Sequence, residues 1–384
     1  MVDRQRVLDA DTHFQPAAES VVPYLDSATR ARLPELEQFL SEVKIGRASQ
    51  VLEPPYRHWY RFSHGGGWGS GKPRRLGDAG PRNEPPERLQ NFMGERFPAP
   101  DAEDTAVDAR LKDMDEEGVD VQVLVPSAFL GHEDPTVDMA FIRALHRFLD
   151  DTCRQYPDRL KSMIVVSPRD IKSSVGQIKA WAGSSWATGI YPSLPLDYPI
   201  DHPDMEPIWA AADEANLAVV HHSFSTGYPG YRDLWDNPFL GRTAGHPWGA
   251  QRAVGAFFGA GIMDRYPNLR FAVLECGFGW LPFWAKRMDD QVTYMGYVAD
   301  GLKHTMSDYM TSGRFFTSIV LHEGPDMLRM VTELLGDHIL MFGSDYPHSE
   351  SRFPVSVTTV DDWAMDATVR RNLMWDNAAR CFGI

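Results

Sequence analysis

Eight short apolar runs restrict the fold of this chain more than any other feature of its sequence. They are rich in Val, Ile, Leu and Phe, and most show no alternation of apolar with polar residues. A strand without such alternation is buried on both faces, as in a parallel sheet covered by helices. We therefore predict eight parallel strands, at Val7–Asp11, Val119–Val125, Lys161–Val166, Gly189–Pro192, Ala218–His222, Arg270–Glu275, Phe315–Val320 and Ile339–Ser344.

Helical patterns lie between these runs. In Asp138–Tyr156 the apolar residues recur at helical spacing and form one face, and Pro157 follows as a stop signal. Further helices are indicated at Met205–Asn216, Ala253–Tyr266, Trp280–Val298, Pro325–Leu335 and Val360–Phe382. Strands that alternate with helices predict right-handed βαβ units. Eight such units predict an α/β fold, a closed (β/α)8 TIM-like barrel that takes up residues 1–384 as a single domain. An open doubly wound sheet is the alternative.

The segment 21–104 interrupts this rhythm after the first predicted strand. It contains many Pro, Gly and aromatic residues, as in Pro54-Pro55-Tyr56 and Gly65-Gly66-Gly67-Trp68. A connection this long within a compact domain is usually functional. Because the segment follows a strand end, we expect it at the C-terminal mouth of the barrel, as an inserted lid or as an interface arm.

The charge balance and the apolar content restrict the class of partner. The chain has 38 basic and 53 acidic residues, which gives a net charge of −15. Nucleic acids and anionic membranes bind basic patches, so neither is the expected main partner. The apolar runs are too short to span a bilayer, and the N-terminus shows no signal-peptide pattern. The three cysteines are far apart in the sequence and predict no disulfide framework. We expect a cytoplasmic protein that acts on a small molecule.

Polar residues gather where the predicted strands end. The first run leads into Asp11 and His13, the fifth ends in His222, the sixth ends in Glu275, and the eighth is followed by Asp345. The carboxyl ends of barrel strands share one mouth, where such folds place their sites. Carboxylate oxygens and imidazole nitrogens together suit zinc, manganese or iron. The pattern therefore predicts a metal site, with zinc as the expected ion, manganese or iron as alternatives, and one or two ions bound.

Each of these residues also has an ordinary structural explanation. Strand alternation turns only one of His221 and His222 inward, so at most one is a ligand. Asp345 is also suited to a turn or a helix cap, and Glu275 to a buried hydrogen-bonded carboxylate. The coincidence of such residues on four predicted strand ends favours the metal site.

The remaining histidines are weaker candidates. His348 is either a substrate contact, a group that orients a ligand, or a capped surface residue. His322 follows the seventh predicted strand and His132 the second, so both are candidates for contact with a substrate. The others are expected to be solvated, and they include His146, His202, His246 and His304.

The motifs resemble those of the amidohydrolase superfamily, in its branch related to the aminocarboxymuconate-semialdehyde and γ-resorcylate decarboxylases. Asp11-Thr12-His13 is similar to the His-x-His motif of that family, with a carboxylate at the first position. Asn216–His222 resembles the strand with the second metal histidine, which matches His222, with His221 as runner-up. Gly343–His348 is the strongest motif, and its Asp345 matches a metal-binding, base-type aspartate.

One departure from the family concerns the stretch that begins at Glu275. The decarboxylases have a histidine there, which leads a His-Gly-Gly run and serves as acid and base. The glutamate weakens the transfer of decarboxylation to this chain, and it adds a carboxylate beside the metal. The resemblance otherwise implies a metal held by Asp11, His13, His222 and Asp345, with Glu275 as a possible further ligand.

Four functions follow from this combination. The leading hypothesis is hydrolysis of a small organic substrate by a metal-activated water, with Asp345 or Glu275 as the catalytic base. The second is non-oxidative decarboxylation of an aromatic or unsaturated acid. The third is a dinuclear manganese or iron enzyme that activates oxygen. The fourth is a non-catalytic subunit beside a related chain. We expect a homo-oligomer, or a hetero-oligomer with such a related chain.

Overall fold

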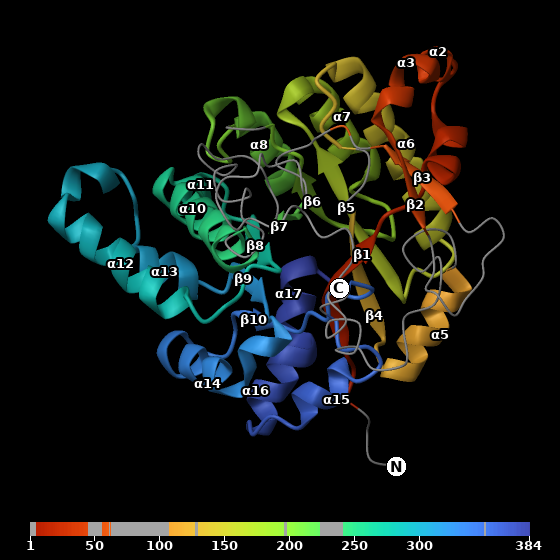
Figure 1. Ribbon diagram of the computed structural model, residues 1–384. Coiled ribbons are helices and arrows are strands. Elements are labelled where there is room, and N and C mark those ends of the chain that lie inside the picture. Colours follow the sequence, from red (N-terminus) through yellow and green to blue (C-terminus); the bar gives the residue numbers. More distant parts are fainter. Residues whose placement is uncertain are drawn as a thin grey trace, which may run out of the picture.

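A computed structural model of the chain describes residues 5–44, 56–60, 62, 107–126, 130–195, 198–222, 241–348 and 351–384. Eight parallel strands follow one another in the sheet in chain order, with helices around them (Figure 1). They are β1 (Leu8–Phe14), β4 (Val121–Pro126), β5 (Leu160–Val166), β6 (Ala187–Pro192), β7 (Ala218–His222), β8 (Arg270–Leu274), β9 (Phe315–Ser318) and β10 (Leu340–Met341). All eight predicted strands are confirmed.

Backbone hydrogen bonds between β1 and the segment after β10 bring the two ends of the sheet together. The amide of Ala10 donates to the carbonyl of Phe342 at 2.9 Å, and the amide of His13 donates to the carbonyl of Tyr346 at 2.7 Å. The structure therefore confirms the predicted (β/α)8 barrel. It also extends the first predicted strand, Val7–Asp11, because β1 continues to Phe14 and so includes His13 as well as Asp11.

The helices on the outside follow the predicted alternation. The larger ones are α5 (Val107–Glu117), α6 (Pro135–Cys153), α7 (Ile171–Trp181), α8 (Glu206–Glu214), α10 (His246–Gly259), α12 (Leu281–Tyr294) and α14 (Gly324–Leu335). Helix α6 shows how the sequence specifies such an element. The carboxylate of Asp134 accepts a hydrogen bond from the amide of Thr136, and Pro135 occupies the first turn. The apolar face that begins at Met139 is buried against the strands.

Two predicted helices are broken in the structure. The first ends with α10 at Gly259 and resumes as α11 (Ile262–Arg265) after Gly261, whose φ is +67°. The second, Val360–Phe382, consists of the end of α15 (Ser356–Asp361), then α16 (Ala367–Arg371), the π-helix η9 (Asn372–Asp376) and α17 (Asn377–Phe382). The side chain of Asp366 caps α16 at its start, and the helical periodicity of the sequence did not reveal this interruption.

Helix α17 closes the N-terminal end of the barrel. Cys381 and Phe382 belong to the same buried cluster as Leu8 and Val121, which begin β1 and β4. At the start of β8, the guanidinium of Arg270 donates to the carbonyl of Cys381 at 2.6 Å. The C-terminal ends of the strands, at the opposite end of the barrel, are therefore the candidate location of the functional site.

The described part of segment 21–104 is ordered into short elements. They are α2 (Ser27–Ala31), α3 (Leu33–Leu36) and an antiparallel pair of strands, β2 (Leu40–Lys44) and β3 (Tyr56–Tyr60), preceded by α1 (Ala18–Val21). The ring of Tyr60 contacts that of Phe141 on α6 at a centroid distance of 5.0 Å. The glycine-rich run and most of the segment lie outside the described residues, so its role as a lid or interface arm stays a prediction. Within the described residues, no helix combines the length and the apolar character needed to cross a bilayer.

Candidate metal centre

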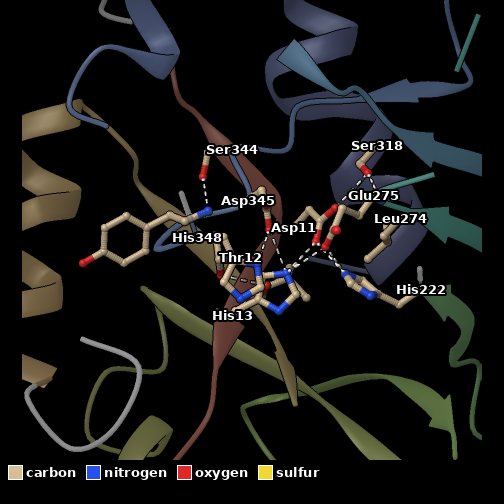
Figure 2. Close-up of polar contacts among 12 residues, drawn as sticks. Asp11, Thr12, His13, His222, Leu274, Glu275, Ser318, Ser344, Asp345 and His348 are labelled. Carbon is tan, nitrogen blue, oxygen red and sulfur yellow. Dashed lines mark hydrogen bonds and ion pairs between the residues drawn. The ribbon is translucent and has the colours of Figure 1, made fainter. Parts of the chain in front are cut away.

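A bulge in β1 turns Asp11 and His13 toward the barrel mouth. Asp9–Thr12 pairs with Gln122–Leu124 on β4, so β1 has four residues where β4 has three. Ala10 points into the barrel interior, and regular alternation would turn the next side chain outward. An extra residue reverses the alternation, which is how bulges redirect side chains beside functional sites. Asp11 and His13 consequently place their side chains among the other candidate ligands (Figure 2).

His222 faces the same point from β7, and His221 does not. Val220 belongs to the interior cluster and Val219 to the outer core, so alternation puts His222 inside. Its Nε2 lies 3.4 Å from Oδ1 of Asp11. Burial, together with the neighbouring His222, lowers the pKa of His221 to about 3, so that imidazole is neutral at pH 7. The structure therefore favours His222 over the runner-up.

Glu275 and Asp345 approach the centre from strained backbone positions. Their φ angles are +53° and +62°, in the left-handed region that residues other than glycine rarely adopt. Such conformations cost roughly 1–3 kcal/mol and cluster at functional sites. Hydrogen bonds hold both positions, because the amide of Glu275 donates to Oγ of Ser318 at 3.0 Å and the amide of Asp345 donates to the carbonyl of Asp11 at 2.9 Å.

The side-chain atoms of these residues converge around Nε2 of His13. This atom lies 3.0 Å from Oδ1 of Asp345, 3.4 Å from Oε2 of Glu275 and 3.8 Å from Oδ1 of Asp11. Figure 2 shows the carboxylates and the two imidazoles pointing toward one another. Two overlapping sets of atoms have the spacing of metal ligands, namely Asp11, His13 and His222, and His13, Glu275, Asp345 and His348.

The electrostatics of the cluster favour a cation. Burial alone would lower the pKa of His222, but the Glu275 and Asp11 carboxylates outweigh it and raise that pKa well above its ordinary value. Burial alone would raise the pKa of Glu275, but the neighbouring imidazoles of His222 and His13 hold it well below its ordinary value. A field that stabilises a proton between these groups also stabilises a metal ion there.

Several buried ligand atoms have no hydrogen-bond partner within the described residues. They are Oδ1 of Asp11, Nε2 of His13, Oε2 of Glu275 and Oδ2 of Asp345. Leaving a buried polar atom unpaired costs about 1–3 kcal/mol, and more for a charged group. Because these atoms converge on one another, a divalent cation would satisfy them together. The residues present therefore fit a metal ion, while its identity and number stay predictions.

Surrounding hydrogen bonds orient the carboxylates. The hydroxyl of Ser318 donates to Oδ2 of Asp11 at 2.9 Å, which leaves Oδ1 directed at the centre. Behind them, Asp9 accepts from the amide of Ser344 at 3.0 Å and from its hydroxyl at 2.5 Å. Burial raises the pKa of Asp9 well above its ordinary value. We therefore assign this carboxyl group to the hydrogen bonds that support the ligands, and not to the ligands themselves. Partners of this kind usually hold metal ligands in place.

The three weaker candidates from the sequence have different positions. His348 lies beside the centre: its Nδ1 is 2.8 Å from Oδ1 of Asp345, and its ring stacks on that of His13 at 3.9 Å. His322 is exposed and borders a cavity of about 20 Å³, which Asp11, Glu275 and Asp345 also line. His132 packs instead against the ring of Phe62, outside both sets of ligand atoms.

Two histidines expected to be solvated are buried. His246 begins α10 and is 8% exposed, and its Nδ1 lies 3.8 Å from Oε1 of Glu275. It therefore joins the candidate site, although no strand end or motif marks it in the sequence. His146 is fully buried in α6, where its Nε2 accepts a hydrogen bond from the amide of Val165 at 2.9 Å. It is a structural residue, and the expectation of solvation was wrong for both.

Comparisons with known proteins agree with this architecture. The chain is 21% identical over 281 residues to 2-amino-3-carboxymuconate-6-semialdehyde decarboxylase of Dictyostelium discoideum. This alignment covers 72% of this chain and 76% of that protein. An amidohydrolase from Mycobacterium avium subsp. paratuberculosis K-10 superposes with a TM-score of 0.71 at 18% identity, over 99% of this chain and 100% of that one. A 5-carboxyvanillate decarboxylase from Novosphingobium aromaticivorans, solved with bound manganese, gives 0.67 at 18% identity, over 99% and 98%.

A family model settles the membership. The model described as Amidohydrolase matches residues 9–384, which is nearly the whole chain and includes every candidate ligand. The resemblance predicted from the strand-end motifs is thereby confirmed. This chain belongs to the amidohydrolase family.

Proposed function

We propose that this protein is a metal-dependent, non-oxidative decarboxylase of an aromatic or unsaturated carboxylic acid. The observation that carries the proposal is the convergence of Asp11, His13, His222 and Asp345 at the C-terminal mouth of the barrel. Similar proteins named as decarboxylases support this activity over hydrolysis, which the sequence alone had placed first. Manganese becomes as good a candidate as zinc, because related decarboxylases were solved with manganese.

The chain's own residues suit the proton transfer that decarboxylation requires. A bound divalent cation supplies positive charge that holds the oxygens of an acidic substrate. The bond between a ring or alkene carbon and the carboxylate carbon then breaks, carbon dioxide leaves, and the ring or alkene carbon takes up a proton. The hydrogen-bonded pair of Asp345 and His348 is placed to pass that proton. His348 is 34% exposed and so connects the buried centre with solvent.

The proposal is tested by measuring carbon dioxide release from a panel of carboxylated phenols and unsaturated acids. The purified protein is loaded with manganese or zinc, and the assay is run with and without oxygen. We expect one mole of carbon dioxide per mole of decarboxylated product, at a rate that oxygen does not change. No release from any member of the panel, by protein shown to contain metal, contradicts the proposal.

The two adjacent histidines of β7 give a matched pair of variants. His222→Ala removes a group that faces the centre, so we expect loss of bound metal and of activity together. His221→Ala removes a buried imidazole of the same strand that points away from it. This second variant is expected to keep its metal even if its stability falls. Equal metal loss in both variants would show that the strand, and not the ligand, was disturbed.

Hydrolysis remains a second candidate because of one residue. The carboxylate of Glu275 is buried, and its Oε2 lies 3.1 Å from Nε2 of His222. The resemblance described above implies a histidine at this position in the family's decarboxylases. A carboxylate at that point is suited to take a proton from an attacking water. Release of an alcohol or amine from esters or amides, with no carbon dioxide from the acids, would favour this function. Elemental analysis of the same preparation decides between one ion and two.

A further inference from the structure

An arginine is buried beside the place where the barrel closes. Arg110, on α5, is 1% exposed, and among the described residues it is the only arginine or lysine that is buried. Its Nη2 donates to the carbonyl of His13 at 2.5 Å, and its Nη1 donates to Oε1 of Gln122 on β4 at 2.9 Å (Figure 1 shows α5 beside β4). An apolar side chain of similar size is often at least as stabilising as a buried ionic group, so packing alone does not account for a guanidinium here.

Two aromatic rings lie against this guanidinium. Its Cζ is 5.0 Å from the ring centre of Tyr346 and 5.6 Å from that of Phe14. The hydroxyl of Tyr346 donates to Oδ2 of Asp113 at 2.7 Å. Asp113 stands three residues after Arg110 and so lies on the same face of α5. The helix therefore holds Tyr346 by its ring and by its hydroxyl.

The contacts of Arg110 reach two candidate ligands from opposite sides of the seam between β1 and the segment after β10. On the β1 side they include His13 itself and the next residue, Phe14. On the other side they include Tyr346, which directly follows Asp345. Nε2 of His13 and Oδ1 of Asp345 are 3.0 Å apart. A shift of one segment along the other would therefore change the spacing of two ligand atoms.

We propose that Arg110 is a positioning residue of the metal centre, which holds the backbone at His13 and Asp345 in the register that lets both side chains bind one ion. The guanidinium suits this role because it is planar, so that its edge donates hydrogen bonds in fixed directions while its face lies against aromatic rings. A lysine ammonium keeps the charge but lacks this geometry. The inference rests on the metal centre of the proposed function, and it holds whichever bond the enzyme breaks.

Cobalt(II) alone is the probe, because its visible absorption depends on the number and geometry of its ligands. Arg110→Lys keeps the positive charge and removes the planar set of donors. We expect this variant to bind Co²⁺ about 10–100-fold more weakly, the usual effect of losing a group that orients metal ligands. We also expect the absorption of the bound ion to change in position or intensity. Competition with a chelator measures the affinity, and circular dichroism establishes that the variant is folded.

Arg314→Lys is the matched control. Arg314 also donates hydrogen bonds to main-chain carbonyls, those of Met263, Tyr266 and Leu269. It directly precedes β9, however, and so lies at the end of the barrel opposite the metal centre. This variant is expected to lose stability, while its Co²⁺ affinity and absorption stay those of the wild type.

Gln122→Met is a milder variant, which tests the same role if Arg110→Lys does not fold. It removes the acceptor that orients the guanidinium and leaves Arg110 and His13 in place. We expect a smaller loss of Co²⁺ affinity, with a spectral change in the same direction.

Three results would overturn the proposal. The first is wild-type affinity and absorption in folded Arg110→Lys or in Gln122→Met. The second is a weaker affinity with an unchanged spectrum, which would assign Arg110 to stability alone. The third is an equal change in Arg314→Lys. Because the test uses no substrate, its outcome is separate from that of the carbon dioxide assay.

Discussion

A single methyl group added at Gly343 would test whether close packing assembles the metal centre. A Cβ atom at this position would lie 2.9 Å from Cβ of Asp11 and 2.9 Å from Cβ of Ser318. Carbon atoms in contact are normally about 3.5–4.0 Å apart, so both neighbours have to move by roughly 0.5–1 Å. Neither contact is with the end of a long side chain that could swing aside. Overpacking of this kind costs about 1–3 kcal/mol of unfolding free energy.

The movement reaches the ligands themselves, because Ser318 also holds Asp11 and the backbone of Glu275. We therefore expect Gly343→Ala to weaken metal binding by roughly 10–100-fold, the usual effect of disturbing the groups that orient metal ligands. Competition with a chromogenic chelator measures the affinity, and denaturant titration of the metal-free protein measures the stability.

Gly255→Ala is the control for an added methyl group. Gly255 lies in α10, and the nearest atoms to its new Cβ would be 3.8 Å away, which is ordinary contact. We expect unchanged metal affinity and a gain in stability of up to about 1 kcal/mol, since alanine favours helix. If Gly343→Ala binds metal as tightly as the wild type and unfolds at the same denaturant concentration, the structural reasoning about this site is refuted.

Three further predictions concern polar side chains that are buried or partly buried. Burial lowers the pKa of His146 to about 4, so between pH 6.5 and 4 the unfolded chain binds more protons than the folded chain. As the pH is lowered over this range, the unfolding free energy should fall by about 3 kcal/mol. Denaturant titrations at several pH values measure this fall, which should be smaller in His146→Gln. Ser318→Ala should weaken metal affinity about tenfold or more without preventing folding, which chelator competition and circular dichroism would measure. Glu323 accepts hydrogen bonds from the amides of Phe278 and Gly279, so Glu323→Ala should lower the melting temperature more than Glu323→Gln, which keeps an acceptor oxygen.

The predicted strands agree with the structure because their signal is local. A strand buried on both faces needs an unbroken apolar run, and that requirement can be read from a few consecutive residues. The ends of the runs also place Asp11, His222 and Asp345 near one another once a barrel is assumed. The sequence is therefore informative about which elements exist and at which end of the barrel the polar residues gather.

Other features depend on contacts between distant segments. The bulge in β1 is a mismatch of register with β4, so nothing in the residues around Asp11 reveals it. His246 follows no predicted strand, and only the folded chain brings it beside Glu275. His146 is buried because its face of α6 packs against β5. The helical spacing of apolar residues alone does not show whether a histidine beside them faces the core or the solvent.

By itself the sequence determined the alternation of strands and helices, the barrel, and the family, since all three rest on short-range periodicity and on motifs at strand ends. Only the tertiary structure decided which ligand atoms meet. Those positions depend on strand register, on left-handed backbone at Glu275 and Asp345, and on hydrogen bonds across the barrel. Each of these features depends on contacts between residues that are remote in the chain. The free energy that stabilises the positions of the ligand atoms therefore arises only when the barrel closes.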